Sequence, residues 1–268
     1  MLSLISRGRM LLDYARERLA QGAEPLVGDP SRGVIILLDG IGGIQIGPLV
    51  ARRGFREAGL PHATYLFDWH RGFPGELLGD LIALRRNLVS GARLARLIRS
   101  FRRAYPTAPL HVLAYSGGTG VAIFAAERLG RRARIDTLIL ACPALSPTYP
   151  LTPALRNVHR CIGLISRRDF GLLGLGTCLF GSIDRRFGLA AGLVGFHRPR
   201  ILYPDDELQY RKLEQVHWCR DFCRLGHFGH HMGWASTAFI REQIAPWLDP
   251  TRATVISDSV PAQMGLVP

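Results

Sequence analysis

Ser116 lies in a sequence context that is typical of a nucleophilic serine. The apolar run Leu110–Ala114 has the length of a buried strand, and a helix-like run begins at about Val121. The small residues between these runs predict a sharp turn that lifts the serine hydroxyl out of the backbone. Ala114 and Gly118, two residues before and after Ser116, are small enough for the strand and the helix to pack closely. We therefore predict that Ser116 is a catalytic nucleophile; the alternative is an ordinary strand-to-helix turn with a spectator serine.

A serine hydroxyl needs a histidine to accept its proton and a carboxylate to orient that histidine. In strand–turn–helix sites of this kind, the acid and the histidine follow the serine along the chain. Asp169 comes directly after an apolar run of strand length and is our candidate for the acid. His231 is our candidate for the base, because it lies in a glycine-rich segment just before the last predicted helix. The alternatives are Asp184, Asp205 and Asp206 for the acid, and His230 and His227 for the base.

A second glycine-rich turn, Asp39–Gly43, follows the apolar run Val34–Leu38. Attack on an acyl carbonyl group places negative charge on its oxygen, and backbone N–H groups stabilise that charge. Gly117 would supply one N–H group, and the turn would supply another from Ile41, with Gly40 beside it. We expect two neighbours of these groups to contact the substrate, Tyr115 and Gly42. The glycines do not have the Gly-x-Gly-x-x-Gly spacing, so a dinucleotide-binding turn is a weak alternative.

The candidate groups follow predicted strands. The apolar runs of strand length are 34–38, 63–67, 110–114, 135–141 and 158–165, with a weaker candidate at 212–218. Helix-like segments separate them, among them 48–58, 77–104 and 236–244. This alternation favours an α/β fold, a mostly parallel central sheet with helices on both faces. Reactive groups collect at the carboxyl ends of the strands in such sheets, where all of our candidates lie.

The chain resembles the α/β-hydrolase superfamily in four features: the turn Leu38–Gly43, the elbow Ala114–Gly118, Asp169 and the loop that ends in His231. The resemblance covers about residues 32 to 248. It implies a compact α/β-hydrolase fold and a serine hydrolase that cleaves an ester, thioester or amide through an acyl-serine intermediate. An acyltransferase of the same fold and a non-catalytic lipid-binding protein are the alternative functions.

Two residues depart from the pattern of the superfamily. Ala114 stands where the usual elbow has glycine, and Asp39 stands where many lipases and esterases of the superfamily carry histidine. Neither change removes a catalytic group, but both leave the class of substrate open. The segment Leu172–Pro204, rich in leucine, phenylalanine and glycine, is our candidate for a cap that forms an apolar acyl pocket.

The length of 268 residues suits one large α/β domain. We predict an N-terminal amphipathic helix within 1–24 that ends near Gly22, a catalytic domain over 25–250 with a small cap within 170–205, and a C-terminal tail over 251–268. The N-terminal segment has neither the uninterrupted apolar core nor the cleavage site of a signal peptide. We expect it to dock on the domain.

The chain carries a net charge of +13, almost all of it from arginine. Seven arginines between Arg85 and Arg103 share an amphipathic helix, where they are expected to form its solvated face. Contact with an acidic lipid surface is an open alternative, whereas the lack of interleaved aromatic residues argues against nucleic acid. The expected partner is therefore a small-molecule ester or lipid-like substrate.

The cysteines and histidines near the C-terminus raise the question of a metal site. Six residues are possible zinc ligands: His217, Cys219, Cys223, His227, His230 and His231. Cys219 and Cys223 do not form a Cys-x-x-Cys knuckle, and Cys219 to His227 does not have the spacing of a known zinc finger, so we predict neither a metal nor a cofactor. Five cysteines without disulfide spacing favour a reducing compartment, for which we predict the cytoplasm.

Overall fold

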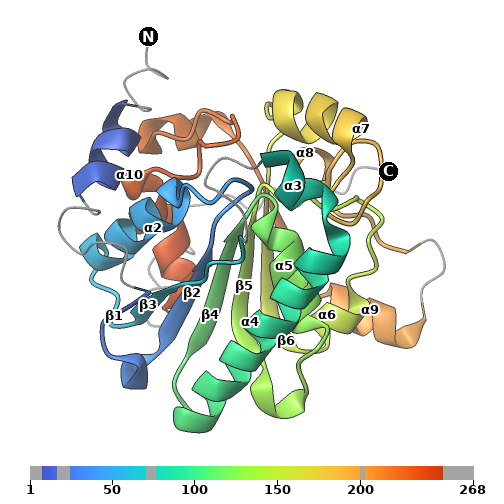
Figure 1. Ribbon diagram of the computed structural model, residues 1–268. Coiled ribbons are helices and arrows are strands. Elements are labelled where there is room, and N and C mark those ends of the chain that lie inside the picture. The colour runs from blue at the N-terminus through green and yellow to red at the C-terminus, as the bar shows by residue number, and fades with distance from the viewer. Residues whose placement is uncertain (1–7, 17–24, 71–76, 200–202, 250–268) are drawn as a thin grey trace.

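The computed structural model describes residues 8–16, 25–70, 77–199 and 203–249 (Figure 1). Seven strands of this part of the chain form one sheet in the order β1-β3-β2-β4-β5-β6-β7. All neighbouring strands pair in parallel except β1, which pairs antiparallel with β3. The strands are β1 (Leu26–Val27), β2 (Val34–Leu38), β3 (Ala63–Leu66), β4 (Leu110–Tyr115), β5 (Ile135–Ala141), β6 (Val158–Ile165) and β7 (Leu213–His217).

Helices cover both faces of this sheet, because the central strands are apolar on both sides. In β2, Val34 and Ile36 contribute to one core cluster, while Ile35 and Leu37 contribute to the other. Successive side chains of a strand point to opposite faces, so an uninterrupted apolar strand needs cover on both. The predicted fold class, α/β with a mostly parallel sheet, is confirmed.

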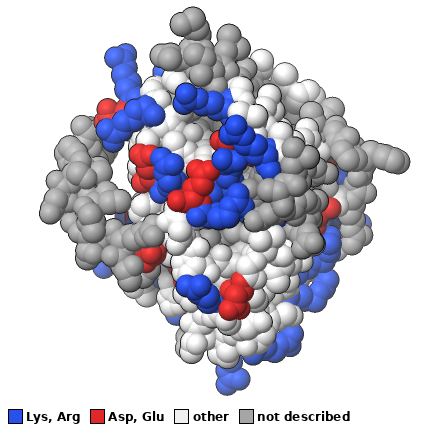
Figure 2. All heavy atoms as spheres, turned by 90° about the vertical axis from the view of Figure 1, so that its left-hand side faces the viewer, with Lys and Arg blue, Asp and Glu red and all other residues white. Residues whose placement is uncertain are grey.

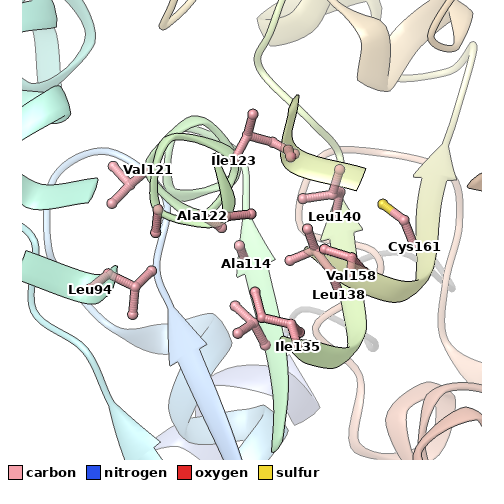
Figure 3. Close-up of a cluster of buried hydrophobic side chains, with 14 of the residues drawn as sticks. Leu94, Ala114, Val121, Ala122, Ile123, Ile135, Leu138, Leu140, Val158 and Cys161 are labelled. Carbon is pink, nitrogen blue, oxygen red and sulfur yellow. The ribbon is translucent and has the colours of Figure 1, made fainter. Parts of the chain in front are cut away.

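The first face is covered by the helices α4 (Leu84–Ala104) and α5 (Gly118–Ala126), with α6 (Thr152–Leu155) beside them. Figure 3 shows side chains of α4 and α5 meeting those of β4, β5 and β6 in this cluster. The second face is covered by α2 (Ile46–Glu57) and by the helical turns over 237–248, which begin with α10 (Thr237–Phe239). The other helices are α3 (Leu77–Ile82), α7 (Thr177–Phe180), α8 (Ala191–Val194) and α9 (Pro204–Tyr210).

Two helical predictions need correction. The region 77–104 is not one helix: the backbone leaves the helical conformation at Ala83, and α3 and α4 are separate. The Asn87 side chain donates to the Asp80 carbonyl oxygen at 2.8 Å, which satisfies a group left open by this break. The last helix is also less regular than predicted, because α10 continues into a π-helical turn, Ile240–Ile244, and a 3₁₀ turn that contains Pro246.

Residues 8–16 are helical and pack on the second face of the domain, through Met10 and Tyr14. Thr237 Oγ1 donates to the Asp13 carboxylate at 2.7 Å. The predicted end of this helix near Gly22 and the predicted C-terminal tail lie outside the described residues.

Basic and acidic side chains lie next to each other on the surface formed by residues 8–16, α2 and α10, as Figure 2 shows. Arg53 pairs with Glu57 at 2.8 Å and with Asp13 at 3.5 Å, and Arg241 pairs with Glu242 at 2.7 Å. Part of the positive charge on this surface is therefore paired with carboxylates.

Structural contacts also engage part of the arginine-rich helix α4. Arg102 donates to the Asp136 carboxylate at 2.8 Å and to the Arg134 carbonyl oxygen, and Arg86 donates to Asp80 at 3.1 Å.

All five cysteines are free. Within the described ranges, no helix has both the length and the apolar character that crossing a bilayer requires.

Candidate active site

Ser116 lies at the junction of β4 and α5, in a backbone conformation that non-glycine residues rarely adopt. Its φ angle is +49°. The surrounding hydrogen bonds hold this conformation: Ser116 N–H donates to the Ala141 carbonyl oxygen at 2.9 Å, and Thr119 Oγ1 donates to the Ser116 carbonyl oxygen at 2.5 Å. A Cβ atom added to Gly118 would lie 2.3 Å from the Asp39 carbonyl oxygen. The elbow therefore requires a glycine at this position.

The structure brings the side chains of Ser116, His231 and Asp169 into contact. His231 Nε2 lies 2.9 Å from Ser116 Oγ, and His231 Nδ1 lies 2.5 Å from Asp169 Oδ2. Asp169 is buried in the turn after β6, and His231 is partly buried. Cys142, after β5, adds a thiol contact to the His231 carbonyl oxygen at 3.6 Å. In this arrangement the imidazole can take the proton of the serine hydroxyl, while the carboxylate orients the ring and stabilises its protonated form.

The alternative acids are engaged elsewhere. Asp184 accepts hydrogen bonds from the backbone N–H and the hydroxyl of Ser146, and from the hydroxyl of Ser182. Asp205 pairs with Arg156 and Asp206 accepts from Thr152, both in the contact between α9 and α6. These carboxylates stabilise loops and helix contacts, and none of them contacts His231.

His227 is a structural residue of the core. Its Nδ1 accepts the Gly229 N–H at 3.2 Å, and its ring packs between those of Phe222 and Phe239. Burial is the main cause that lowers the pKa of His227 to about 3. A histidine that stays neutral and is enclosed in this way is not available to Ser116. The His230 carbonyl oxygen accepts the Gly233 N–H at 2.8 Å, in the turn that carries His231.

The turn after β2 runs past Ser116 at close range. A Cβ atom added to Gly40 would lie 3.2 Å from Ser116 Cβ, and one added to Gly117 would lie 2.7 Å from Ile41 Cγ2. Within the described ranges, the N–H groups of Ile41 and Gly117 have no protein acceptor. The Gly42 N–H, by contrast, donates to Asp80 Oδ2 at 2.9 Å. The Gly42 N–H is therefore engaged within the protein, whereas Gly40 and Ile41 line the cavity beside Ser116 and stay the predicted donors to an oxyanion.

Asp80 and His70 anchor this turn, and neither was predicted from the sequence. Asp80 is 2% exposed; besides the turn N–H, it accepts from Arg86 at 3.1 Å, and its Oδ2 lies 3.5 Å from His70 Nε2. His70 Nε2 lies 2.7 Å from the Gly40 carbonyl oxygen. Trp69 Nε1 donates to the Asp39 carbonyl oxygen at 2.9 Å. These contacts fix the position of the oxyanion turn from outside the reacting groups.

Asp39 is buried and holds the two ends of the turn together. Its Oδ2 accepts the Gln45 N–H at 2.5 Å, just before α2. Burial raises the pKa of Asp39 from 3.8 to about 6, and the N–H groups of Gln45 and Gly40 oppose that shift. Asp39, which stands where many lipases and esterases carry histidine, therefore links the two ends of this turn through its carboxylate.

A cavity of about 420 Å³ opens beside Ser116 and His231. Tyr115 lines it, as predicted for a substrate contact, and Gly40 and Ile41 line it from the oxyanion turn. Gly42 is absent from its wall. Most of the opposite wall comes from the predicted cap: Leu172, Leu173, Gly176, Thr177 and Phe180, in a π-helical turn and α7. The apolar wall suits a hydrocarbon chain.

A metal ion would have to compete with the serine contact. In the described part of the chain, the cluster of metal-binding side chains is Cys142, Asp169 and His231, whose ligand atoms lie within 4.8 Å of one another. Burial raises the pKa of the Cys142 thiol well above its usual range. A neutral thiol is a poor metal ligand, and the histidine and carboxylate already bond to each other. Of the residues that the sequence offered as zinc ligands, His231 belongs to this cluster; the others, His217, Cys219, Cys223, His227 and His230, do not.

No family model and no curated protein matches this chain. Solved structures to which the chain is similar include a predicted CIB-like hydrolase from Thermoplasma acidophilum, with 17% identity, a TM-score of 0.45, and 85% of this chain and 89% of that chain covered. LpqC, a poly(3-hydroxybutyrate) depolymerase from Bordetella parapertussis, has 14% identity and a TM-score of 0.49 over 83% and 82%. The carboxylesterase CesB from Bacillus subtilis has 10% identity and a TM-score of 0.40 over 91% and 99%. The identities and TM-scores are low, so the case for a function rests on the geometry of this chain.

Proposed function

We propose that this chain, which has the α/β-hydrolase fold, is a serine hydrolase that cleaves a carboxylic ester through an acyl-serine intermediate. The observation that carries the proposal is the chain of contacts from Ser116 Oγ to His231 Nε2, and from His231 Nδ1 to Asp169. Ser116 is the nucleophile, His231 is the general base and acid, and Asp169 orients the imidazole and stabilises its protonated form.

In the first half of the reaction, Ser116 Oγ bonds to the carbonyl carbon of the ester while His231 Nε2 takes the hydroxyl proton. The carbonyl oxygen becomes an oxyanion, and the N–H groups of Ile41 and Gly117 stabilise it. The bond to the alcohol oxygen then breaks, and His231 returns the proton to that oxygen, which leaves the acyl group on Ser116. Loss of one oxyanion donor typically costs about 3 to 4 kcal/mol of transition-state stabilisation.

In the second half, water replaces the alcohol. His231 Nε2 takes a proton from the water as the oxygen attacks the acyl carbon, and returns it to Ser116 Oγ as the acid departs. The apolar wall of the cavity, with Leu172, Leu173 and Phe180, would hold the acyl chain. This wall supports an ester of a hydrophobic acid as the substrate.

A fluorophosphonate probe, which reacts with activated serine hydroxyls, tests the proposal. We expect covalent labelling of the wild type, none of Ser116→Ala, and strongly reduced labelling of His231→Ala. His230→Ala is the matched control and should label nearly as fast as the wild type. Labelling that persists in Ser116→Ala would overturn the mechanism. Full reactivity of His231→Ala with loss in His230→Ala would move the base to the neighbouring residue.

A further inference from the structure

Large apolar side chains are exposed to solvent in the cap. Five of them expose more than half of their surface, from 55% to 66%: Phe170, Leu172, Leu175, Leu179 and Phe187. Exposed apolar side chains that gather in one patch mark an interaction surface, whereas single exposed ones do not. The segment is short, so these residues lie close to one another in space as well as in the sequence.

Some of the exposed apolar side chains also form part of the wall of the cavity beside Ser116. Leu172 and Phe180 are exposed and also line the cavity, as does Ile44 from the oxyanion turn. The helix α3 contacts α7 (Figure 1), and the exposed Ile82 follows Leu81, which lines the cavity. We call this surface the apolar rim: Ile44, Ile82, Leu172, Leu179, Phe180 and Phe187.

The charges beside the apolar rim are basic. Arg186 is exposed next to Phe187, and Arg185 lies with its guanidinium group 5.5 Å from the centre of the Phe187 ring. The two acids of this part of the chain are turned inward: Asp169 contacts His231, and Asp184 accepts from serine side chains. The surface around the opening thus combines exposed apolar groups with positive charge and lacks compensating carboxylates from the cap.

We propose that the apolar rim docks on the surface of an anionic phospholipid bilayer and that the substrate is an ester of a long-chain acid held in that bilayer. Apolar side chains insert between lipids, while arginines pair with the anionic headgroups, the combination that surface binding requires. An acyl chain would then pass from the bilayer into the cavity without crossing water. The identity of the substrate rests on the proposed serine hydrolase function; the docking does not.

The charge distribution favours a bilayer over a second copy of the chain. Two copies that met rim to rim would bring Arg185 and Arg186 of both copies together, with no acid from the cap between them. An anionic lipid surface supplies the negative charge that such a pair would lack. It also accepts side chains of any shape, so it does not require the flat complementary surface that a dimer needs.

Vesicles made of diether analogues of the phospholipids test the docking, because these lipids contain no carboxylic ester that the protein could cleave. We expect the wild type to sediment with vesicles of equimolar phosphatidylcholine and phosphatidylglycerol, less with phosphatidylcholine alone, and less as salt is added. The double variant Leu179→Asp/Phe187→Asp should lower vesicle affinity by about 100-fold, since each inserted side chain contributes roughly tenfold. Neither residue lines the cavity. Leu208→Asp, at an exposed leucine of α9, is the matched control and should bind as the wild type does.

The outcomes separate the docking from the catalytic function. Hydrolysis of a short, water-soluble ester should be the same in the wild type and in the double variant, because the catalytic groups are untouched. Equal vesicle binding by the wild type and the double variant would overturn the docking, whatever the activity. Rim-dependent vesicle binding without any esterase activity would support the docking and overturn the hydrolase function. A wild-type dimer in light scattering that the double variant dissociates would replace the lipid surface by a second copy.

Discussion

Replacement of Asp39 by asparagine should change how stability depends on pH, because the carboxylate is buried in the oxyanion turn. The pKa of Asp39 is raised from 3.8 to about 6, so between these pH values the folded chain holds a proton that the unfolded chain releases. Wild-type stability from this group is therefore greatest at low pH and is lost as the pH rises through about 6. The full difference is about 3 kcal/mol, at roughly 1.4 kcal/mol for each pH unit.

Asp39→Asn keeps the shape of the side chain and cannot ionise. We expect its free energy of unfolding minus that of the wild type to be about 1 to 2 kcal/mol larger at about pH 8 than at about pH 5, because the wild type loses stability over this range. The charge-assisted hydrogen bonds from the N–H groups of Gln45 and Gly40 exist only while Asp39 is ionised, so the pKa of about 6 already contains them. Any effect of the substitution on the protonated form is an offset that does not depend on pH. The assay is urea unfolding of both proteins at a series of pH values, followed by far-ultraviolet circular dichroism.

The exposed Asp221→Asn variant reports the effect of net charge alone and is the control for this comparison. The quantity to examine is the difference between each variant and the wild type, since other titrating groups cancel in it. The reasoning would be refuted if the free energy of unfolding of Asp39→Asn minus that of the wild type stayed constant, or decreased, as the pH rises. It would mean that the N–H groups around the carboxylate outweigh the cost of its burial.

Three further substitutions test the geometry of the site. Gly118→Ala should lower the free energy of unfolding by about 1 to 3 kcal/mol in urea, because the new Cβ would meet the Asp39 carbonyl oxygen. Asp169→Asn should reduce kcat for a soluble ester by up to roughly 10⁴-fold with little change in KM, since the imidazole of His231 loses its carboxylate partner. Asp80→Ala should reduce kcat by up to about 100-fold with an unchanged pH profile, because the oxyanion turn loses its anchor without loss of a reacting group.

The sequence was sufficient for the parts of the fold that follow from local pattern. The run Val34–Leu38 is β2 with unchanged bounds, and Ile135–Ala141 and Val158–Ile165 are β5 and β6. The short antiparallel β1 was not predicted, because two residues, Leu26 and Val27, carry no periodicity. The region 77–104 was predicted as one helix because no glycine or proline marks the break at Ala83. Only the tertiary contacts of Asp80 and Asn87 show why the chain turns there.

The candidate site, like the fold, has residues that the sequence predicted and residues that only the structure identifies. The serine and the glycine turn carry recognisable local patterns, and chain order narrowed the choice of acid and histidine; that these side chains also meet in space is a finding of the structure. Asp80 and His70 follow no motif, because they act on the backbone of a turn that is distant in the sequence. A single sequence offers no signal for such residues. Asp80 and His70 stabilise the turn only because the fold places the Gly42 N–H and the Gly40 carbonyl oxygen beside their side chains.

The close approach of three backbone segments explains which small residues the site requires. Gly40, Gly117 and Gly118 each lie where a Cβ atom would collide with a neighbouring segment or side chain of the site. Ala114 lies inside β4, fully buried in the core cluster beneath α5, where its methyl group packs against apolar neighbours. The departure from the usual elbow pattern is therefore harmless at that position, whereas the same methyl group at Gly118 would push the oxyanion turn away from Ser116. The distance between the turn and the serine, rather than the number of glycines, is what the chain has to preserve.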